Sequence, residues 1–361
     1  MSKGGRFERK KKPLNKKKLA WSLTGTVVAV ALAAVVLVLS SYMGKIKKVD
    51  VEKIEYTKAT TEAVATTDAT TEVVETTQPH VASSADYINF LVVGQAARAG
   101  ETERFADTMI LCTLNTHTKT LTMTSLLRDS FIKMPDYKGH YGGRIKLTTI
   151  YHLGSIYGNG AAGSMELMNM TLYNNFGIEV DYNFEIDFDA FINIVDILGG
   201  VELELTQAEA DYLNADDFWV YYDIEPGYQS IDGMTALSYA RMRKAAGDNE
   251  SDIVRTERQR KLVSALIGKL KNISLTDLKK MADEVLPLIT TSMSSAEMTQ
   301  MLLKLLPMLP DLTIEKGGTC PAEYSGDSVD IYSDGVMHSV LRFDVNKTTK
   351  TMRAITEGET Q

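Results

Sequence analysis

Apolar residues form one long uncharged run near the start of the chain and many shorter runs from residue 87 onward. The long run, Leu19–Met43, holds 25 residues without a charge. As a helix it would extend about 37 Å, enough to cross a hydrocarbon core of about 30 Å. A cleaved signal peptide is the alternative, but the run is longer than a usual h-region and its small-residue pattern lies in its middle. We therefore expect an uncleaved transmembrane anchor at residues 19–43.

The shorter runs alternate between the spacing of strands and the spacing of helices. Predicted strands are Tyr87–Gly94, Thr108–Leu114, Lys119–Leu126, Phe184–Phe188 and Val201–Leu205. Predicted helices are Leu147–Tyr157, Ala162–Phe176, Asp189–Leu198, Thr206–Leu213, Asp232–Met242, Asp252–Lys271, Leu275–Thr290 and Ala296–Leu306. The polar residues 115–118 predict a hairpin turn between the second and third strands. This order predicts an α/β fold with a central mixed β-sheet flanked by helices.

The pattern also predicts the domain organisation. Residues 44–85 are rich in Thr, Ala and Glu, which indicates a disordered linker. Residues 86–310 are long enough for one large domain with a single core. Residues 311–361 read as a C-terminal extension that is only partly ordered, with strand-like patches at Leu312–Ile314 and Val329–Tyr332 and a frayed end.

Charge separates the two sides of the expected anchor. Residues 1–18 hold nine basic residues and one acidic residue, so the positive-inside rule places them in the cytoplasm as a basic tail. The whole chain is at −8, and the part after the anchor is therefore at about −16. A domain so acidic is a poor match for nucleic acid, and the tail is too short for a DNA-reading module. Two cysteines, Cys112 and Cys320, do not make a disulfide scaffold, although a bridge between them stays open.

Arginines gather in the stretch Ser238–Arg260. Arg241 and Arg243 end one predicted helix, and Arg255, Arg258 and Gln259 share a face of the next at i, i+3 and i+4. Two guanidinium groups about 6 Å apart repel by about 3 kcal/mol at an effective dielectric of about 20, so converging arginines favour a bound phosphate or pyrophosphate. By its spacing alone, an arginine-rich amphipathic helix is usually a solvated face, and both readings stay open at this point.

Six segments, taken together and in this order, resemble the LytR–CpsA–Psr family of cell-wall glycopolymer ligases. They are Ala106–Asn115 (ADTMILCTLN), Ser125–Ser130 (SLLRDS), Lys146–Gly154 (KLTTIYHLG), Asp196–Leu203 (DILGGVEL), Ile231–Arg243 (IDGMTALSYARMR) and Asp252–Gln259 (DIVRTERQ). The resemblance covers about 150 residues and implies the family's fold for the domain at 86–310.

The resemblance implies a phosphotransferase that moves a glycopolymer phosphate from a polyprenyl-pyrophosphate carrier to a peptidoglycan hydroxyl. It implies partners in the membrane, the lipid-linked glycan and peptidoglycan, and a Gram-positive type cell membrane with the domain outside. By position, the pyrophosphate-binding residues would be Arg128, Arg241, Arg243, Arg255 and Gln259. The catalytic set would be Asp107, Arg128 and Asp129, and Asp107 would bind Mg²⁺. Phe188, Phe191 and Ile194 fit either an apolar slot for the lipid or ordinary core.

Two positions depart from the family pattern. Ala96 stands where the family usually has an aspartate, and Phe105 stands where an arginine is common, with Arg104 one place away. Because Mg²⁺ can be held by one carboxylate and substrate phosphates, Asp107 can serve alone, or Glu101 or Glu103 can take part. The alternatives are a protein that binds the lipid pyrophosphate without transferring it and a lipid pyrophosphatase.

Overall fold

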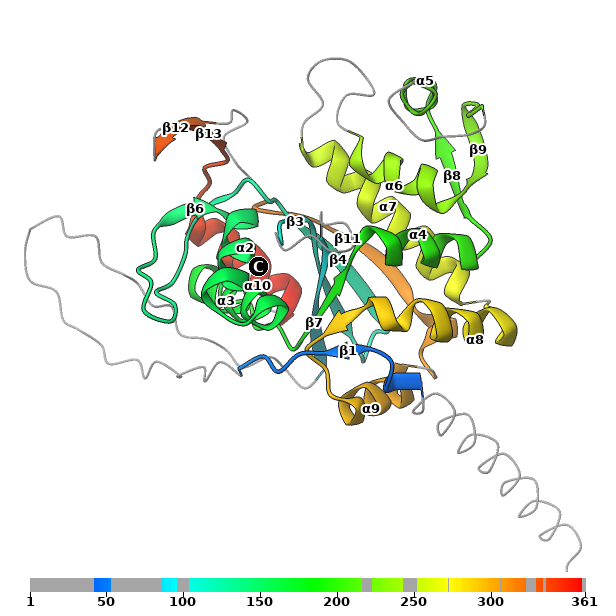
Figure 1. Cartoon of the computed structure of the whole chain (residues 1–361), viewed down its shortest axis with the longest axis horizontal. Coiled ribbons are helices and arrows are strands. Elements are labelled where there is room, and N and C mark those ends of the chain that lie inside the picture. Colours follow the sequence, from blue (N-terminus) through cyan, green and yellow to red (C-terminus); the bar gives the residue numbers. More distant parts are fainter. Residues whose placement is uncertain are drawn as a thin grey trace, which may run out of the picture.

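A seven-stranded mixed sheet forms the centre of the molecule, with helices on both faces (Figure 1). The computed structural model describes residues 42–52, 86–95, 104–215, 223–242, 252–271, 273–305, 307–322, 329–333 and 336–358. The order of strands in the sheet is β1 (Lys47–Lys48), β10 (Thr290–Thr291), β7 (Tyr182–Ile186), β2 (Tyr87–Gln95), β3 (Ala106–Asn115), β4 (Thr120–Leu126) and β11 (Thr313–Cys320). The predicted fold class, a mixed sheet between helices, is confirmed.

The middle of the sheet is an antiparallel meander of β2, β3 and β4. Its apolar strands are covered on both faces, so that Leu91, Val93 and Leu111 are fully buried. The predicted hairpin between β3 and β4 is confirmed, because the side chain of Asn115 accepts hydrogen bonds from the backbone N–H groups of His117 and Thr118 in the turn. His117 is therefore a turn residue.

One face of the sheet is covered by α2 (Leu147–Tyr157), α3 (Gly160–Phe176) and α10 (Val345–Thr356). Met168 of α3 belongs to this core, and Met165 of the same helix is also fully buried. A Cβ on Gly154 would lie 2.5 Å from the carbonyl oxygen of Gly163, and a Cβ on Gly163 would lie 2.3 Å from that of Gly154. Glycine at both positions is what allows α2 and α3 to approach so closely.

The other face carries α7 (Asp252–Leu270), whose half-buried Val263 and Ile267 pack against Ile110, Cys112 and Met123 of the sheet. Beyond α7 lies a second core. It is built from α4 (Phe188–Ile197), α5 (Gln207–Leu213), α6 (Gly233–Arg241) and the hairpin of β8 (Val201–Leu205) with β9 (Gly227–Ile231). As a result α7 is packed on two sides, against the sheet and against this second core.

Two predicted elements run into residues that belong to another element. The helix expected over Leu275–Thr290 ends as α8 (Leu275–Glu284), is followed by a 3-10 turn at Leu286–Leu288, and gives way to strand β10. Pro287 accounts for this, because proline has no N–H to continue an α-helix. The strand expected over Phe184–Phe188 lies two residues earlier, since the side chain of Asp187 caps α4 by accepting from Ala190 N.

Both ends expected to lie outside the core contribute to it. Within 44–85, the expected linker, Ile46 is buried and β1 pairs with β10 in parallel. After residue 310, β11 pairs in parallel with β4 and Met352 of α10 lies in the main core. The C-terminal residues are thus part of the same domain, and the expected boundary at 310 is wrong.

The remaining elements are peripheral: β5 (Phe131–Lys133) pairs with β6 (Arg144–Lys146), β12 (Val329–Ser333) pairs with β13 (Val336–Val340), and α9 (Ser295–Leu305) packs at the end of the sheet that holds β1 and β10. Cys112 and Cys320 are both buried and free, so they do not form a bridge. None of the helices in the described residues has the length and apolarity of a membrane span, and the expected anchor at 19–43 lies almost wholly outside those residues.

Candidate functional site

The hairpin register brings together the first two predicted site residues. Ile110 of β3 pairs with Ser125 of β4, and continuing this antiparallel register three residues further places Asp107 opposite Arg128. The side chains meet there: Nη1 of Arg128 donates to Oδ1 of Asp107 at 2.6 Å. A carboxylate at the start of one strand and an arginine just past the end of the next thus form an ion pair at one edge of the meander.

The beginning of α7 supplies the second half of the site. Asp252 is the first residue of α7. Its Oδ1 lies 2.5 Å from Nη2 of Arg255 and 3.8 Å from Nε of Arg128. An aspartate in the first turn is favoured by the helix dipole. Asp252 therefore joins two arginines that are 127 positions apart in the chain (128 and 255).

Arg128 is the centre of this network, and its side chain is 15 % exposed. Burial lowers the pKa of Arg128, but the nearby carboxylates of Asp252, Asp129 and Asp107 more than offset it, so the pKa is raised. Oδ2 of Asp129 lies 3.5 Å from Nε of Arg128, and Oδ1 of Asp129 forms an ion pair with Nζ of Lys146 at 2.8 Å. The guanidinium remains fully charged and is held in place by three carboxylates.

Backbone hydrogen bonds fix the loop that carries Arg128 and Asp129. The N–H of Thr148, in the first turn of α2, donates to the carbonyl of Arg128 at 3.0 Å. The N–H of Leu127 donates to the carbonyl of Cys320, and that of Leu341 donates to the carbonyl of Asp129, each at 2.9 Å. The C-terminal residues that were expected to be an extension thus hold the central loop of the site.

The other predicted residues are placed less centrally. Arg241, at the exposed end of α6, lies with its guanidinium carbon 4.9 Å from the ring centroid of Phe188. Gln259 is buried, and its Nε2 donates to the carbonyl of Ala240 at 3.2 Å. Gln259 therefore connects α7 to α6, one residue before Arg241. Arg243 lies outside the described residues.

Arg258, which shares the predicted face with Arg255, points elsewhere. Its Nη2 donates to the carbonyl of Met242 at 2.8 Å, and its Nη1 lies 3.8 Å from Oε1 of Glu209. Both contacts are on the side of the second core. The structure thus brings Arg128 and Arg255 together, keeps Arg241 on the neighbouring helix, and uses Arg258 to fasten α7 to the end of α6.

The two positions that depart from the family pattern have distinct environments. Phe105 stacks on His152 of α2, with ring centroids 4.2 Å apart. Arg104 forms an ion pair with the buried carboxylate of Glu185, which also accepts a 2.6 Å hydrogen bond from Tyr151. Ala96, Glu101 and Glu103 lie outside the described residues. Arg104 is therefore committed to Glu185 on the α2 side of the sheet.

Asp107 is the candidate ligand for a metal ion, and its side chain is 34 % exposed. Among the described residues, no group of three or more His, Cys, Asp or Glu side chains is arranged to hold a metal. Mg²⁺, however, usually keeps several waters and binds through one or two carboxylates and substrate phosphates. The donor set fits Mg²⁺ only in that shared manner, with Asp107 as the protein ligand.

Sequence reasoning missed two members of the site, Asp252 and Lys146. Asp252 had a signal, because an acid at the start of a predicted helix and three residues before an arginine favours an ion pair. Lys146 lacked one, since its contact with Asp129 depends on how β6 leads into α2. In the resulting arrangement, three carboxylates alternate with three positive side chains: Asp107, Asp129 and Asp252 with Arg128, Lys146 and Arg255. A phosphate could bind here by replacing a carboxylate as the ion-pair partner of an arginine.

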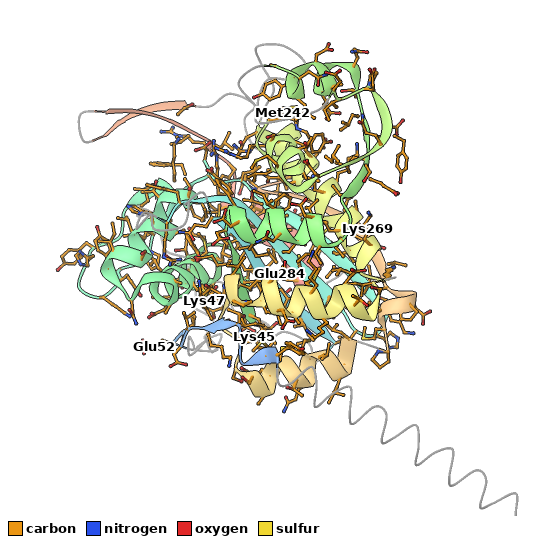
Figure 2. The ribbon with its side chains drawn as sticks, turned by 45° about the vertical axis from the view of Figure 1, so that its right-hand side comes forward. Lys45, Lys47, Glu52, Met242, Lys269 and Glu284 are labelled. Carbon is orange, nitrogen blue, oxygen red and sulfur yellow. The ribbon has the colours of Figure 1, made fainter. Side chains whose placement is uncertain are left out.

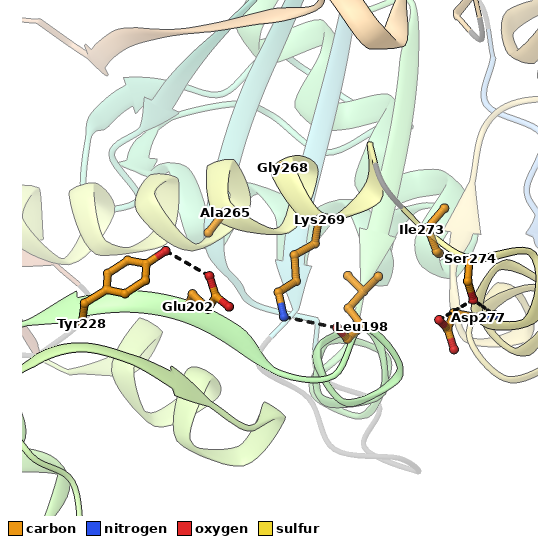
Figure 3. A pocket seen from close by; sticks show the side chains of 9 residues that line it. All are labelled: Leu198, Glu202, Tyr228, Ala265, Gly268, Lys269, Ile273, Ser274 and Asp277. Carbon is orange, nitrogen blue, oxygen red and sulfur yellow. Dashed lines mark hydrogen bonds between the residues drawn. The ribbon is translucent and has the colours of Figure 1, made fainter.

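A surface cleft of about 480 Å³ lies elsewhere, between α4, α7, α8 and the β8–β9 hairpin (Figure 3). Its polar groups are bonded to one another: Tyr228 donates to Glu202 at 3.0 Å and Lys269 to the carbonyl of Leu198 at 3.3 Å. Figure 2 labels Met242, at the end of α6, and Lys269, near the end of α7. Lys269 is 14 residues beyond Arg255, about 21 Å along the helix, so this cleft is separate from the arginine site.

The model of the LytR_cpsA_psr family matches residues 51–332 of the chain. Among curated proteins, the chain is 32% identical over 189 residues to the polyisoprenyl-teichoic acid–peptidoglycan teichoic acid transferase TagU of Bacillus licheniformis, covering 52% of this chain and 54% of that protein. It is 30% identical over 187 residues to biofilm regulatory protein A of Streptococcus mutans, a match that covers 49% of this chain and 41% of that protein. The chain spans about half the length of the curated relatives it matches.

Solved structures share the fold. Protein gbs0355 from Streptococcus agalactiae superposes with a TM-score of 0.57 at 27% identity, covering 74% of this chain and 88% of that one. The LytR-CPS2A-psr family protein YwtF (TagT) with bound octaprenyl pyrophosphate lipid gives a TM-score of 0.53 at 21% identity, covering 79% and 96%. At this identity the second likeness shows the fold alone.

Proposed function

Because the chain belongs to the LytR_cpsA_psr family, we propose that it is a phosphotransferase that attaches a glycopolymer to peptidoglycan. The donor is a polyprenyl-pyrophosphate-linked glycan, the acceptor is a peptidoglycan hydroxyl, and polyprenyl phosphate leaves. The observation that carries the proposal is the meeting of Arg128 and Arg255 on the single carboxylate of Asp252. The names of two curated relatives, TagU of Bacillus licheniformis and TagT of Bacillus subtilis, both teichoic acid transferases, support the substrate class.

Electrostatics explains how such a site promotes transfer. As the acceptor oxygen bonds to phosphorus and the bond to the polyprenyl phosphate breaks, negative charge spreads over the phosphate oxygens. Arg128 and Arg255 are fixed donors for that charge, and positive groups held in place before the reaction stabilise the transition state without reorganising. Each charged hydrogen bond contributes about 1.5–3 kcal/mol. Asp129, held by Lys146, orients Arg128.

We propose Arg241, Arg243 and Gln259 as further contributors on the α6 side. Arg241 lies over Phe188 and is exposed, so it is available to the distal phosphate or the first sugar of the donor. Gln259 acts by positioning, because its bond to Ala240 fixes the end of α6 against α7. Mg²⁺ bound between Asp107 and the donor phosphates would add positive charge at the same place.

The proposal includes membrane attachment. A single span at residues 19–43 with residues 1–18 in the cytoplasm would hold the domain outside, on the side where polyprenyl-linked glycans are attached to peptidoglycan. The uncharged run of 25 residues and the nine basic residues before it support this topology.

Transfer in vitro tests the assignment. Purified full-length protein in detergent is incubated with a lipid-linked glycopolymer and peptidoglycan oligomers, and the product is measured by mass spectrometry. Arg128→Ala and Arg255→Ala should each reduce transfer by at least about 100-fold, since each removes a charged donor from the phosphates. Lys304→Ala, on the exposed side of α9, is the matched loss of one positive charge and should leave transfer unchanged. Undiminished transfer by the Arg128 and Arg255 variants would rule the site out.

The same assay separates the alternatives. Wild-type protein that releases polyprenyl phosphate but forms no glycan–peptidoglycan product would be a lipid pyrophosphatase. Protein that co-purifies with polyprenyl pyrophosphate and yields neither product would be a binding protein. The alanine at position 96 is the observation that favours the second case, and Ala96→Asp should then restore transfer in the presence of Mg²⁺.

A further inference from the structure

Another arginine, Arg260, lies between α7 and the sheet and has no role in the network described above. It is 5 % exposed, and its Nη1 donates to Oγ of Ser125 on β4 at 2.5 Å. Its Nε is enclosed and has no hydrogen-bond partner among the described residues. Arg260 therefore keeps unused hydrogen-bonding capacity in the seam between α7 and the sheet.

Arg260 also differs from its neighbours in charge compensation. Arg128 is in contact with Asp107, Asp129 and Asp252, and Arg255 with Asp252. In the described part of the chain no carboxylate forms an ion pair with Arg260, and only Glu257 acts on it from a distance. Burial consequently lowers the pKa of Arg260. A buried charge without a partner is costly, and buried charges are as a rule paired with an opposite charge, which here a ligand could supply.

Arg260 lies near both halves of the phosphate site along the chain. Ser125, its contact, is near the end of β4, three residues before Arg128, which lies in the turn that follows the strand. Along α7, Arg260 is five residues after Arg255, which is about 7.5 Å along the helix and about 140° around its axis, so Arg260 faces the sheet rather than Asp252. Immediately beyond it on the same seam, Val263 and Ile267 pack against Ile110 and Met123, so the polar part of the seam ends at Arg260.

We propose that Arg260 is a further ligand for the pyrophosphate of the donor lipid, and that it contacts the phosphates from below, on the side of the apolar seam. The inference rests on the proposed function. The donor phosphates would supply the negative charge that Arg260 lacks within the protein. In the absence of the donor, the hydrogen bond to Ser125 holds the guanidinium in place. Arg260 is thus a phosphate-binding residue at the point where the polar site meets the apolar interior.

The test compares Arg260→Met, Arg260→Lys and Lys261→Met in the full-length protein. Lys261 is exposed, donates to the carbonyl of Glu204, and offers the same loss of charge at the adjacent position. Calorimetric titration with octaprenyl pyrophosphate in detergent gives Kd, and thermal unfolding without ligand gives Tm. Arg260→Met should weaken binding by about 10- to 100-fold, Arg260→Lys by less, and Lys261→Met by less than about 2-fold.

The unfolding measurement distinguishes binding from a structural role. Because Arg260→Met removes an uncompensated buried charge, the Tm without ligand should stay unchanged or rise. Wild-type affinity in a folded Arg260→Met variant would overturn the inference. If Arg260→Met unfolds or its Tm falls sharply, Arg260→Lys decides, and wild-type affinity in that variant would show that Arg260 is only a structural residue. If wild-type protein does not bind octaprenyl pyrophosphate, the proposed function fails first, and this inference fails with it.

Discussion

Asp252 acts as an internal counterion, and replacing it with asparagine should expose the repulsion between Arg128 and Arg255. Its Oδ1 lies 2.5 Å from Nη2 of Arg255 and 3.8 Å from Nε of Arg128. Asp252→Asn keeps the size and an acceptor oxygen but removes the negative charge. The perturbation is therefore electrostatic.

The expected magnitude follows from these distances. The two nitrogens share one oxygen and are therefore at most about 6 Å apart, where two positive charges repel by about 3 kcal/mol at an effective dielectric of about 20. The Asp252 side chain is only 21 % exposed, so its carboxylate has lost part of its hydration. This desolvation cost offsets part of the stability that its attraction to the two arginines contributes. We expect a net loss of about 1–3 kcal/mol in the free energy of unfolding, equivalent to a Tm about 2–10 °C lower for a domain of this size.

An anion should reverse this loss. Inorganic pyrophosphate can bind between the arginines once the carboxylate charge is gone, so it should raise the Tm of Asp252→Asn by more than it raises that of the wild type. The assay is thermal unfolding with and without pyrophosphate at low salt, because salt screens the effect.

The control is Asp277→Asn. Asp277 also lies in the first turn of a helix, α8, and its side chain accepts from Ser274. It reports the loss of a favourable charge near a helix N-terminus, about 0.3–1 kcal/mol, without the arginines. If Asp252→Asn loses no more stability than this control and gains no additional stabilisation from pyrophosphate, the counterion argument is wrong.

Three further predictions concern the scaffold. Deleting residues 311–361 removes β11 and α10 and should abolish cooperative unfolding followed by circular dichroism, whereas a dispensable extension would leave it intact. Arg258→Gln should lower Tm by several degrees, because the carbonyl of Met242 loses a charged donor worth about 1.5–3 kcal/mol; an unchanged Tm would contradict this. Burial raises the pKa of Cys112 from 9.0 to about 12, so its thiol should react with a thiol reagent only after unfolding. Since the folded pKa is the higher one, the Cys112 contribution to stability is complete below about pH 9 and is lost as pH rises toward 12, which unfolding measured across that range would check.

Much of the fold was predictable because its signals are local. The β3–β4 hairpin follows from two apolar runs joined by four polar residues, and its register then places Asp107 opposite Arg128. The limits of α2 and β8 agree with the prediction to the residue. Each has one apolar face and a glycine next to one end, Gly158 after α2 and Gly200 before β8. A meeting of Arg128 with Arg255 was expected from the family resemblance and is found.

What the sequence could not supply depends on contacts between distant segments. The pairing of β11 with β4 joins residues 193 positions apart, such as Thr313 and Thr120, and the largely polar sequence of β11 gives no local sign of being part of the central sheet. For the same reason nothing indicated that Cys320 and Leu341 hold the loop at Arg128.

The sequence by itself determined which residue types are present and that Arg255, Arg258 and Gln259 share one face of a helix. Only the tertiary structure decided what each of them does. Because α7 is packed on two sides, its polar residues are buried in different directions: Arg255 toward Asp252, Arg258 toward Met242 and Arg260 toward Ser125. Helical spacing gives the direction of a side chain around the helix axis, but its partner is set by the element that packs there.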